Sequence, residues 1–174
     1  MASANATNQA PTAPPEWDVW EPQVSYGPSM TTYSRWAEAA DPDSWPWTVP
    51  SSKTSLVVIA VRGVDIDNPR DAAAVAASLE TGFPATPSIT TQTDGALVVT
   101  FGGTIGPSGD LDIRWTSDGT VDGRATSQLS GTTNSSTVAT SRLVATAGTV
   151  TPTLAPVESV GRGGVLVFAL RPAS

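Results

Sequence analysis

The residues of this chain that could do chemistry are mostly aspartates, which gather near turns. They form one group of three and two pairs: Asp65, Asp67 and Asp71; Asp110 and Asp112; Asp118 and Asp122. Two carboxylates held at a suitable separation can hydrolyse a glycosidic bond. Aspartates at turns also accept hydrogen bonds from their own backbone, and we favour this structural interpretation for all three groups. We therefore predict no catalytic residue.

Metal binding is the second chemistry to consider for the segment 65–71, DIDNPRD. An EF-hand loop needs glycine at its sixth position and glutamate at its twelfth, where this chain has Arg70 and Ala76. That motif therefore fails. The chain has no Cys and no His, which excludes a Cys/His zinc site, a histidine base and a cysteine nucleophile. We expect neither a metal nor a cofactor, and a protein that is not an enzyme.

Aromatic residues are concentrated near the start of the chain. Five of the six tryptophans and both tyrosines lie between residues 17 and 47. Such rings can cover a sheet or close one end of a core, or they can form a contact surface for a protein or a glycan. The candidates for an interface are Trp17, Trp20, Tyr26, Trp36, Trp45 and Trp47.

Composition and charge restrict the partners. The 174 residues, 39% of them hydrophobic, suffice for one domain with a core. Sixteen acidic and nine basic residues give a net charge of -7, which disfavours binding to nucleic acid. No apolar window is long enough to span a membrane, and residues 1–15 lack the basic start and apolar core of a signal peptide. We expect no nucleic-acid or membrane partner.

The elements that would position these residues are mainly strands. The runs 55–62 and 164–171 are apolar and end at turns, as buried strands do. Further strands are predicted at 30–37, 110–116, 124–129 and 137–147, with a flexible tip at 130–136 and a turn with a short edge strand at 41–50. Asn68, Pro69 and Gly82 delimit a predicted helix over 69–81, and an extended loop is the alternative because the apolar residues there are mostly alanine. The Asp94–Gly95 pair predicts a hairpin of 88–93 with 96–102.

Regularly spaced short strands separated by Gly, Pro, Ser and Thr predict an all-β fold, an antiparallel β-sandwich of jelly-roll type with at most one short helix. Three prolines within residues 1–15 indicate an extended or flexible N-terminal arm. The sandwich domain is then expected to span residues 16–174. Arg62, at the end of one buried strand, is expected to pair with Asp65 or Asp67.

The order of short motifs resembles that of a known group of proteins. In chain order these are PPEW (14–17), YSRWA (33–37), DPDSWPWT (41–48), AVRGVDIDNP (60–69), TQTDGALVV (91–99) and FALRPA (168–173). This order is similar to that of a β-sandwich domain of bacteriophage virion proteins, often labelled minor tail proteins, especially in phages of actinobacteria. The resemblance implies a non-enzymatic structural or accessory protein of the virion, either a minor tail or a capsid-decorating protein.

The resemblance also implies the partners: other virion proteins, capsid or tail subunits, and further copies of the chain in a homo-oligomer. One departure is that the PPEW motif is preceded by few residues, where the related domains have a strand or two. We expect the N-terminal arm or a neighbouring subunit to fill the open sheet edge. The alternative function is a carbohydrate-binding or adhesion module that stacks the same aromatic residues on host cell-surface glycans.

Overall fold

The computed structural model describes residues 1–6, 11–25, 29–49, 54–108, 113–127 and 133–174. Within these ranges the chain forms strands and no helix. The strands are β1 (Ala2–Ala6), β2 (Asp18–Ser25), β3 (Ser29–Ser34), β4 (Thr54–Val58), β5 (Arg70–Leu79), β6 (Ile89–Thr90), β7 (Ala96–Ser108), β8 (Trp115–Ser117), β9 (Thr120–Ser127), β10 (Thr133–Val144), β11 (Thr149–Val150), β12 (Leu154–Pro156) and β13 (Arg162–Leu170).

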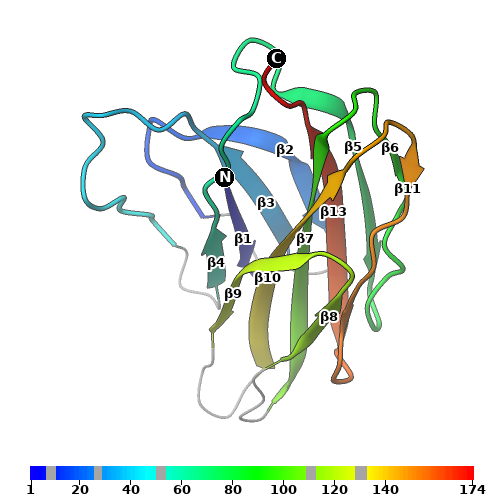
Figure 1. The fold of residues 1–174 in the computed structure, drawn as a ribbon. Coiled ribbons are helices and arrows are strands. Elements are labelled where there is room, and N and C mark those ends of the chain that lie inside the picture. Colours follow the sequence, from blue (N-terminus) through cyan, green and yellow to red (C-terminus); the bar gives the residue numbers. More distant parts are fainter. Residues whose placement is uncertain (7–10, 26–28, 50–53, 109–112, 128–132) are drawn as a thin grey trace.

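Two antiparallel sheets face each other (Figure 1). The first has the strand order β2-β3-β1-β4 and the second the order β5-β13-β7-β10-β9. Two short ribbons, β6 with β11 and β8 with β12, accompany the five-stranded sheet. The predicted all-β antiparallel sandwich is confirmed, whereas its jelly-roll form stays a prediction.

The five-stranded sheet is buried on both faces, which explains the continuous apolar runs of its central strands. On β7, Val99 faces the four-stranded sheet and Val98 faces the ribbons. On β13, Phe168 faces the four-stranded sheet and Val167 faces the ribbons. The core between the sheets includes Met30, Val57, Phe101, Leu166 and Phe168. Because successive side chains of a strand point to opposite faces, a strand covered on both faces has no polar alternation.

Residues 2–6, which we assigned to an arm, form a strand inside the four-stranded sheet. Ala2 pairs with Tyr33 of β3 on one side and with Val58 of β4 on the other, and it is fully buried. The three prolines that indicated an arm begin at Pro11, so none of them removes a hydrogen-bond donor from this strand. The N-terminal segment thus supplies a strand to the sandwich, but this strand lies inside the sheet, between β3 and β4, and not at an edge as expected.

The predicted helix over 69–81 is wrong, because this segment forms strand β5. Its residues pair with β13 from Leu79, opposite Gly163, to Arg70, opposite Leu170. Ala74 packs against the core between the two sheets, whereas Val75 packs against the apolar cluster on the other face of the five-stranded sheet. Alanine favours helices in isolation, but pairing with a buried neighbouring strand outweighs that small preference.

The predicted hairpin of 88–93 with 96–102 is also wrong. The turn itself is present, since Gly95 has φ +77° and the N–H of Ala96 donates to the carbonyl of Thr93. However, β6 pairs with β11, whereas β7 pairs with β10 and β13. The turn therefore carries the chain from a ribbon into the main sheet.

Smaller differences concern the ends of elements. Residues 133–136, expected in a flexible tip, begin β10, where Ser135 and Ser136 are fully buried. The hydroxyl of Ser55 on β4 lies 2.9 Å from that of Ser135 and 2.6 Å from that of Thr137, which joins the two sheets. The edge strand expected within 41–50 is reduced to a single bridge, Thr48 with Thr12. Residues 110–112 and 130–132 lie outside the described residues.

The two sheets also meet along their edges. Gly123 of β9 packs on β4 so closely that a Cβ atom there would lie 2.9 Å from Cγ1 of Val57. At the other edge, Arg70 of β5 donates to the carbonyl of Trp20 on β2 and forms an ion pair with Glu21. These contacts join the two sheets at both edges.

Candidate functional site

The outer face of the four-stranded sheet is covered by aromatic rings. Tyr33 of β3 packs edge-on against Trp47 at 5.1 Å between ring centroids, and Trp47 packs against Trp17 at 5.4 Å. The Tyr33 hydroxyl donates to the carbonyl of Pro11 at 2.5 Å, and burial raises the pKa of Tyr33. Trp17 and Trp47 thus act as a cover, here called the aromatic cover, together with Tyr33 and Ala13.

Trp20 closes the edge of the sandwich between β2 and β5. Its ring lies 6.1 Å from that of Phe168 in the core, and the guanidinium of Arg70 lies 4.4 Å from its centroid on the outside. Arg70 also pairs with Glu21, whose side chain is buried. Burial raises the pKa of Glu21, and the charge of Arg70 partly opposes that rise.

A second arginine stacks on a tryptophan just beyond β3. The guanidinium of Arg35 lies 4.1 Å from the ring centroid of Trp45, and it forms an ion pair with Asp41. Arg35 Nε donates to the carbonyl of Trp36, and the other oxygen of Asp41 accepts from the N–H of Glu38. These bonds fix the segment that extends from β3 on the left of Figure 1.

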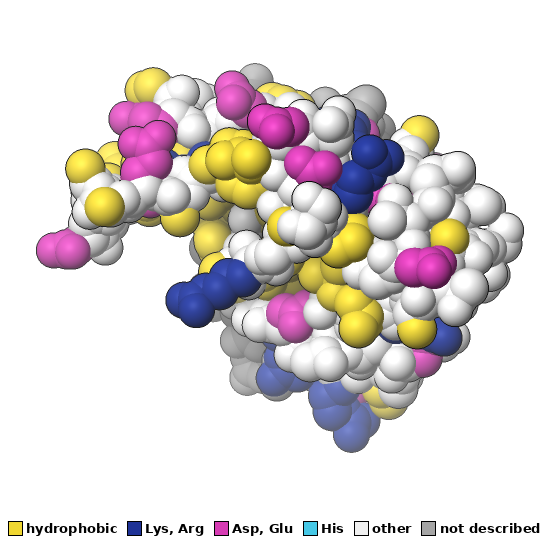
Figure 2. All heavy atoms as spheres, turned by 45° about the horizontal axis from the view of Figure 1, so that its top comes forward, with side chains coloured by type: hydrophobic (Ala, Val, Ile, Leu, Met, Phe, Trp, Pro, Cys, Tyr) yellow, Lys and Arg dark blue, Asp and Glu magenta, His cyan; other side chains and the backbone are white. Residues whose placement is uncertain are grey.

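These side chains surround a hollow of about 670 Å³, here called the aromatic hollow. It lies beneath the projecting segment in Figure 2, and hydrophobic atoms form much of its wall. The residues that line it include Glu16, Trp17, Asp18, Val19, Trp20, Arg35, Trp36, Glu38, Asp41, Trp45, Val58 and Ile59. Three apolar side chains here are strongly exposed: Trp36 by 46%, Val58 by 54% and Val19 by 63%.

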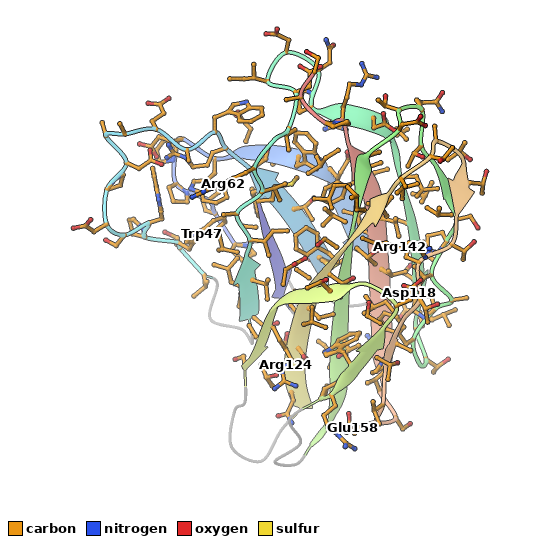
Figure 3. All side chains as sticks on the ribbon, viewed as in Figure 1. Trp47, Arg62, Asp118, Arg124, Arg142 and Glu158 are labelled. Carbon is orange, nitrogen blue, oxygen red and sulfur yellow. The ribbon has the colours of Figure 1, made fainter. Side chains whose placement is uncertain are left out.

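The charged residues that line the hollow are mainly acidic, and the exposed Arg62 lies on the same side of the molecule as the projecting segment (Figure 3). Arg35 is neutralised by Asp41, whereas Glu16, Asp18 and Glu38 form no ion pair within the part of the chain that the structure describes. Hydrogen-bond donors are buried in the wall as well. Among the described residues, Trp17 Nε1, Trp20 Nε1 and Arg35 Nη1 have no acceptor. Such groups are rare in folded proteins because each costs free energy.

The predicted interface residues therefore separate into groups. Trp17, Trp20, Trp36 and Trp45 meet at the hollow, and Trp47 lies beside it in the aromatic cover. Tyr26 lies outside the described residues. Sequence reasoning did not include Arg35 and Arg70. An arginine next to a tryptophan in the sequence, Arg35-Trp36, is a local signal that could have identified Arg35. Arg70 gives no such signal, because it contacts Trp20 across 50 residues of chain.

Asp65, Asp71 and Asp118 are not among the residues that line the hollow, and each has a structural partner. Asp65 Oδ1 accepts hydrogen bonds from the backbone N–H groups of residues 67 and 68, as expected for an aspartate in a turn. Asp118 binds Arg142 at 2.7 Å and the N–H of Thr153 at 2.8 Å. Figure 3 shows that Asp118 and Arg142 lie together, on the opposite side of the molecule from Trp47. Asp110 and Asp112 fall outside the described residues.

The ion pair expected for Arg62 is wrong. Arg62 is exposed, and among the described residues it pairs with neither Asp65 nor Asp67. The Oδ1 atom of Asp65 already accepts from two backbone N–H groups, which removes the need for a cation. Within the described ranges, no three acidic side chains are grouped in a way that would hold a metal ion.

Comparison with models of protein families, with curated proteins and with solved structures finds no match for this chain. None of the described residues belongs to a helix that could cross a membrane. A function is therefore inferred from the motif order, the sandwich and the aromatic hollow.

Proposed function

We propose that this chain is a non-enzymatic structural or accessory protein of a bacteriophage particle, a minor tail or capsid-decorating protein that acts through protein-protein contacts on the particle exterior. The aromatic hollow is the observation that carries the proposal. It combines exposed Trp36, Val58 and Val19 in one concave surface. Apolar surface of this kind, rimmed by charge, is typical of contact sites between proteins.

Two further observations support this function. The motif order resembles that of phage virion sandwiches, and the chain is an antiparallel sandwich. The exposed side chains of the hollow would form the contact with a partner. Copies arranged by the symmetry of the particle would form the homo-oligomer.

Purified particles provide the test. Mass spectrometry of phage particles purified by density gradient should detect this chain in a fixed ratio to the major capsid protein. Electron microscopy of particles that lack its gene should show missing density on the exterior of the head or the tail. Absence of the chain from intact particles would overturn the proposal, and the position of the missing density would distinguish decoration from a tail role.

A second candidate function is binding of host cell-surface glycans. The exposed ring of Trp36 beside Asp18 and Glu38 favours it, since sugars stack on indole rings and donate hydroxyl hydrogen bonds to carboxylates. Titration of the protein with cell-wall fragments should then change its tryptophan fluorescence, and Trp36→Ala should abolish the change. An unchanged spectrum at saturating fragment would remove this candidate.

A further inference from the structure

Two arginines near the hollow are bound in the same way. Arg35 stacks on Trp45 and pairs with Asp41, and Arg70 stacks on Trp20 and pairs with Glu21. In each unit the flat guanidinium lies on an indole face while its N–H groups bind a carboxylate. This arrangement satisfies a cation twice, because the ring attracts its charge and the carboxylate accepts its hydrogen bonds.

Trp36 is an exposed tryptophan of the hollow over which no arginine is stacked. It is 46% exposed, and within the described residues neither a ring nor a cation lies over it. Glu38 and Asp18 line the same hollow and form no ion pair there. The hollow thus contains an exposed ring and carboxylates that are not paired with a cation of the described residues.

We propose that the hollow binds an extended, arginine-bearing segment of a neighbouring protein, whose guanidinium stacks on Trp36 and pairs with Glu38 or Asp18. The proposal rests on the proposed function, because it names the chemistry of the partner in the particle contact. The net charge of -7 and the carboxylates of the hollow attract a basic segment. An acidic partner would be repelled by them.

The shape of the guanidinium favours arginine over other cations. A guanidinium is planar and can stack on a ring while it forks to a carboxylate, which an ammonium group cannot do equally well.

The binding test uses a blocked peptide, acetyl-Gly-Arg-Gly-Arg-Gly-amide, titrated into the whole chain and followed by the NMR signals of the indole N–H groups. The Trp36 signal should shift most. Versions with lysine should bind several-fold more weakly, and the neutral analogue with citrulline should show no saturable binding. Equal binding of the citrulline peptide would overturn the proposal, as would a response only to cell-wall glycan, which would favour the second candidate function.

Variants locate the site. Trp36→Ala should weaken binding of the arginine peptide about tenfold, and Glu38→Gln should weaken it less. The matched controls are Leu143→Ala, another exposed apolar residue, and Asp122→Asn, which removes one charge outside the hollow. Both should bind as the unaltered chain does. Equal loss in Glu38→Gln and Asp122→Asn would show that only overall charge matters and would overturn the assignment to Trp36.

Incorporation into particles separates this proposal from the function on which it rests. If the chain is found in particles and Trp36→Ala is incorporated at the normal level, the arginine contact is wrong and the virion function stands. If the arginine peptide binds through Trp36 but the chain is absent from particles, the virion function is wrong and the chemistry of the hollow stands. Trp36→Leu, which keeps an apolar side chain but removes the ring, gives the same readout should Trp36→Ala fail to fold.

Discussion

The outer faces of the two sheets are both covered with the help of a tryptophan, but the two covers differ in how complete they are. On the five-stranded sheet, Trp115 of β8 packs against Phe83 at 5.4 Å, and its Nε1 donates to the Ser136 hydroxyl at 3.2 Å. On the four-stranded sheet, Trp17 packs as closely against Trp47, yet its Nε1 has no acceptor among the described residues.

The two covers also differ in how closely the atoms around them are packed. A Cβ atom added to Gly163 beneath the first cover would lie 2.5 Å from the ring of Phe83. Beside the second cover lies a hollow of about 670 Å³. A cover that served stability alone would be expected to satisfy its donors and fill its space. The contrast therefore teaches that the cover of the five-stranded sheet is closely packed, whereas the aromatic side of the molecule keeps an open hollow, which is where we propose that a partner binds.

The largest effect is expected where the aromatic side supports the fold. Arg70→Ala should lower the free energy of unfolding by about 3 kcal/mol, because Glu21 would stay buried without its partner. Urea unfolding followed by circular dichroism measures this. Arg142→Ala is the matched control, since its pair with Asp118 is exposed and should cost less than about 1 kcal/mol. Equal losses would show that Glu21 is not held by Arg70.

The difference in packing between the two covers predicts how much stability is lost when a side chain is enlarged. Gly163→Ala should lower the free energy of unfolding by about 2 kcal/mol, because the ring of Phe83 and the carbonyl of Gly82 must move. Ala60→Leu, on the wall of the hollow, should change it by less than about 0.5 kcal/mol because the added atoms enter open space. Thermal unfolding of both variants compares them, and a larger loss in Ala60→Leu would contradict the contrast in packing.

The indole N–H groups give a smaller contrast. Trp115→Phe should cost about 1 kcal/mol more than Trp17→Phe, because only the first substitution breaks a hydrogen bond. The two substitutions remove the same atoms from a half-buried ring, so each serves as the control for the other. Denaturant midpoints at equal slope measure the difference. A greater loss for Trp17→Phe would mean that its N–H has a strong partner in the folded chain.

The smallest effect concerns pH. The pKa of Glu21 is raised in the folded chain, so the folded state holds this proton more tightly than the unfolded state does. Its contribution is therefore fully present below the ordinary pKa of a glutamate and is lost as pH rises through the raised value. Glu21→Gln should remove this slope, and its stability relative to the unaltered chain should improve from pH 4 to pH 7. Parallel stability profiles would contradict the raised pKa.

Sequence reasoning succeeded where burial alone determines the pattern. The strand predicted at 164–171 corresponds to β13, because a strand at the centre of a sheet that is covered on both faces leaves a long apolar run. The run 55–62 was expected to be a buried strand, but it forms only the short β4, which lies at the edge of its sheet and leaves Val58 exposed. Sequence reasoning failed where the secondary structure of a segment depends on its pairing partner. The alanine-rich segment of β5, for example, forms a strand because it pairs with β13. The same holds for β6, since nothing near residue 89 reveals that it pairs with residue 150.

The candidate site was predictable in part. The aromatic block between residues 17 and 47 indicated either a cover or a contact surface, and the packing of Trp17 and Trp47 is that of a cover. The stacked arginines were not predicted, because Arg70 reaches Trp20 only after the sheets are assembled. Exposure also depends on the final packing, so the sequence alone did not distinguish Trp36 from the other tryptophans.

The central claim, that the aromatic hollow is a contact site for an arginine-bearing segment of a neighbouring protein, is tested most directly by electron microscopy of the assembled particle at side-chain resolution. The account predicts density from a neighbouring protein in the hollow, with an arginine guanidinium on the ring of Trp36 and close to Glu38 or Asp18. A chain attached to the particle through another face, with Trp36 in contact with solvent and the hollow empty, would contradict it.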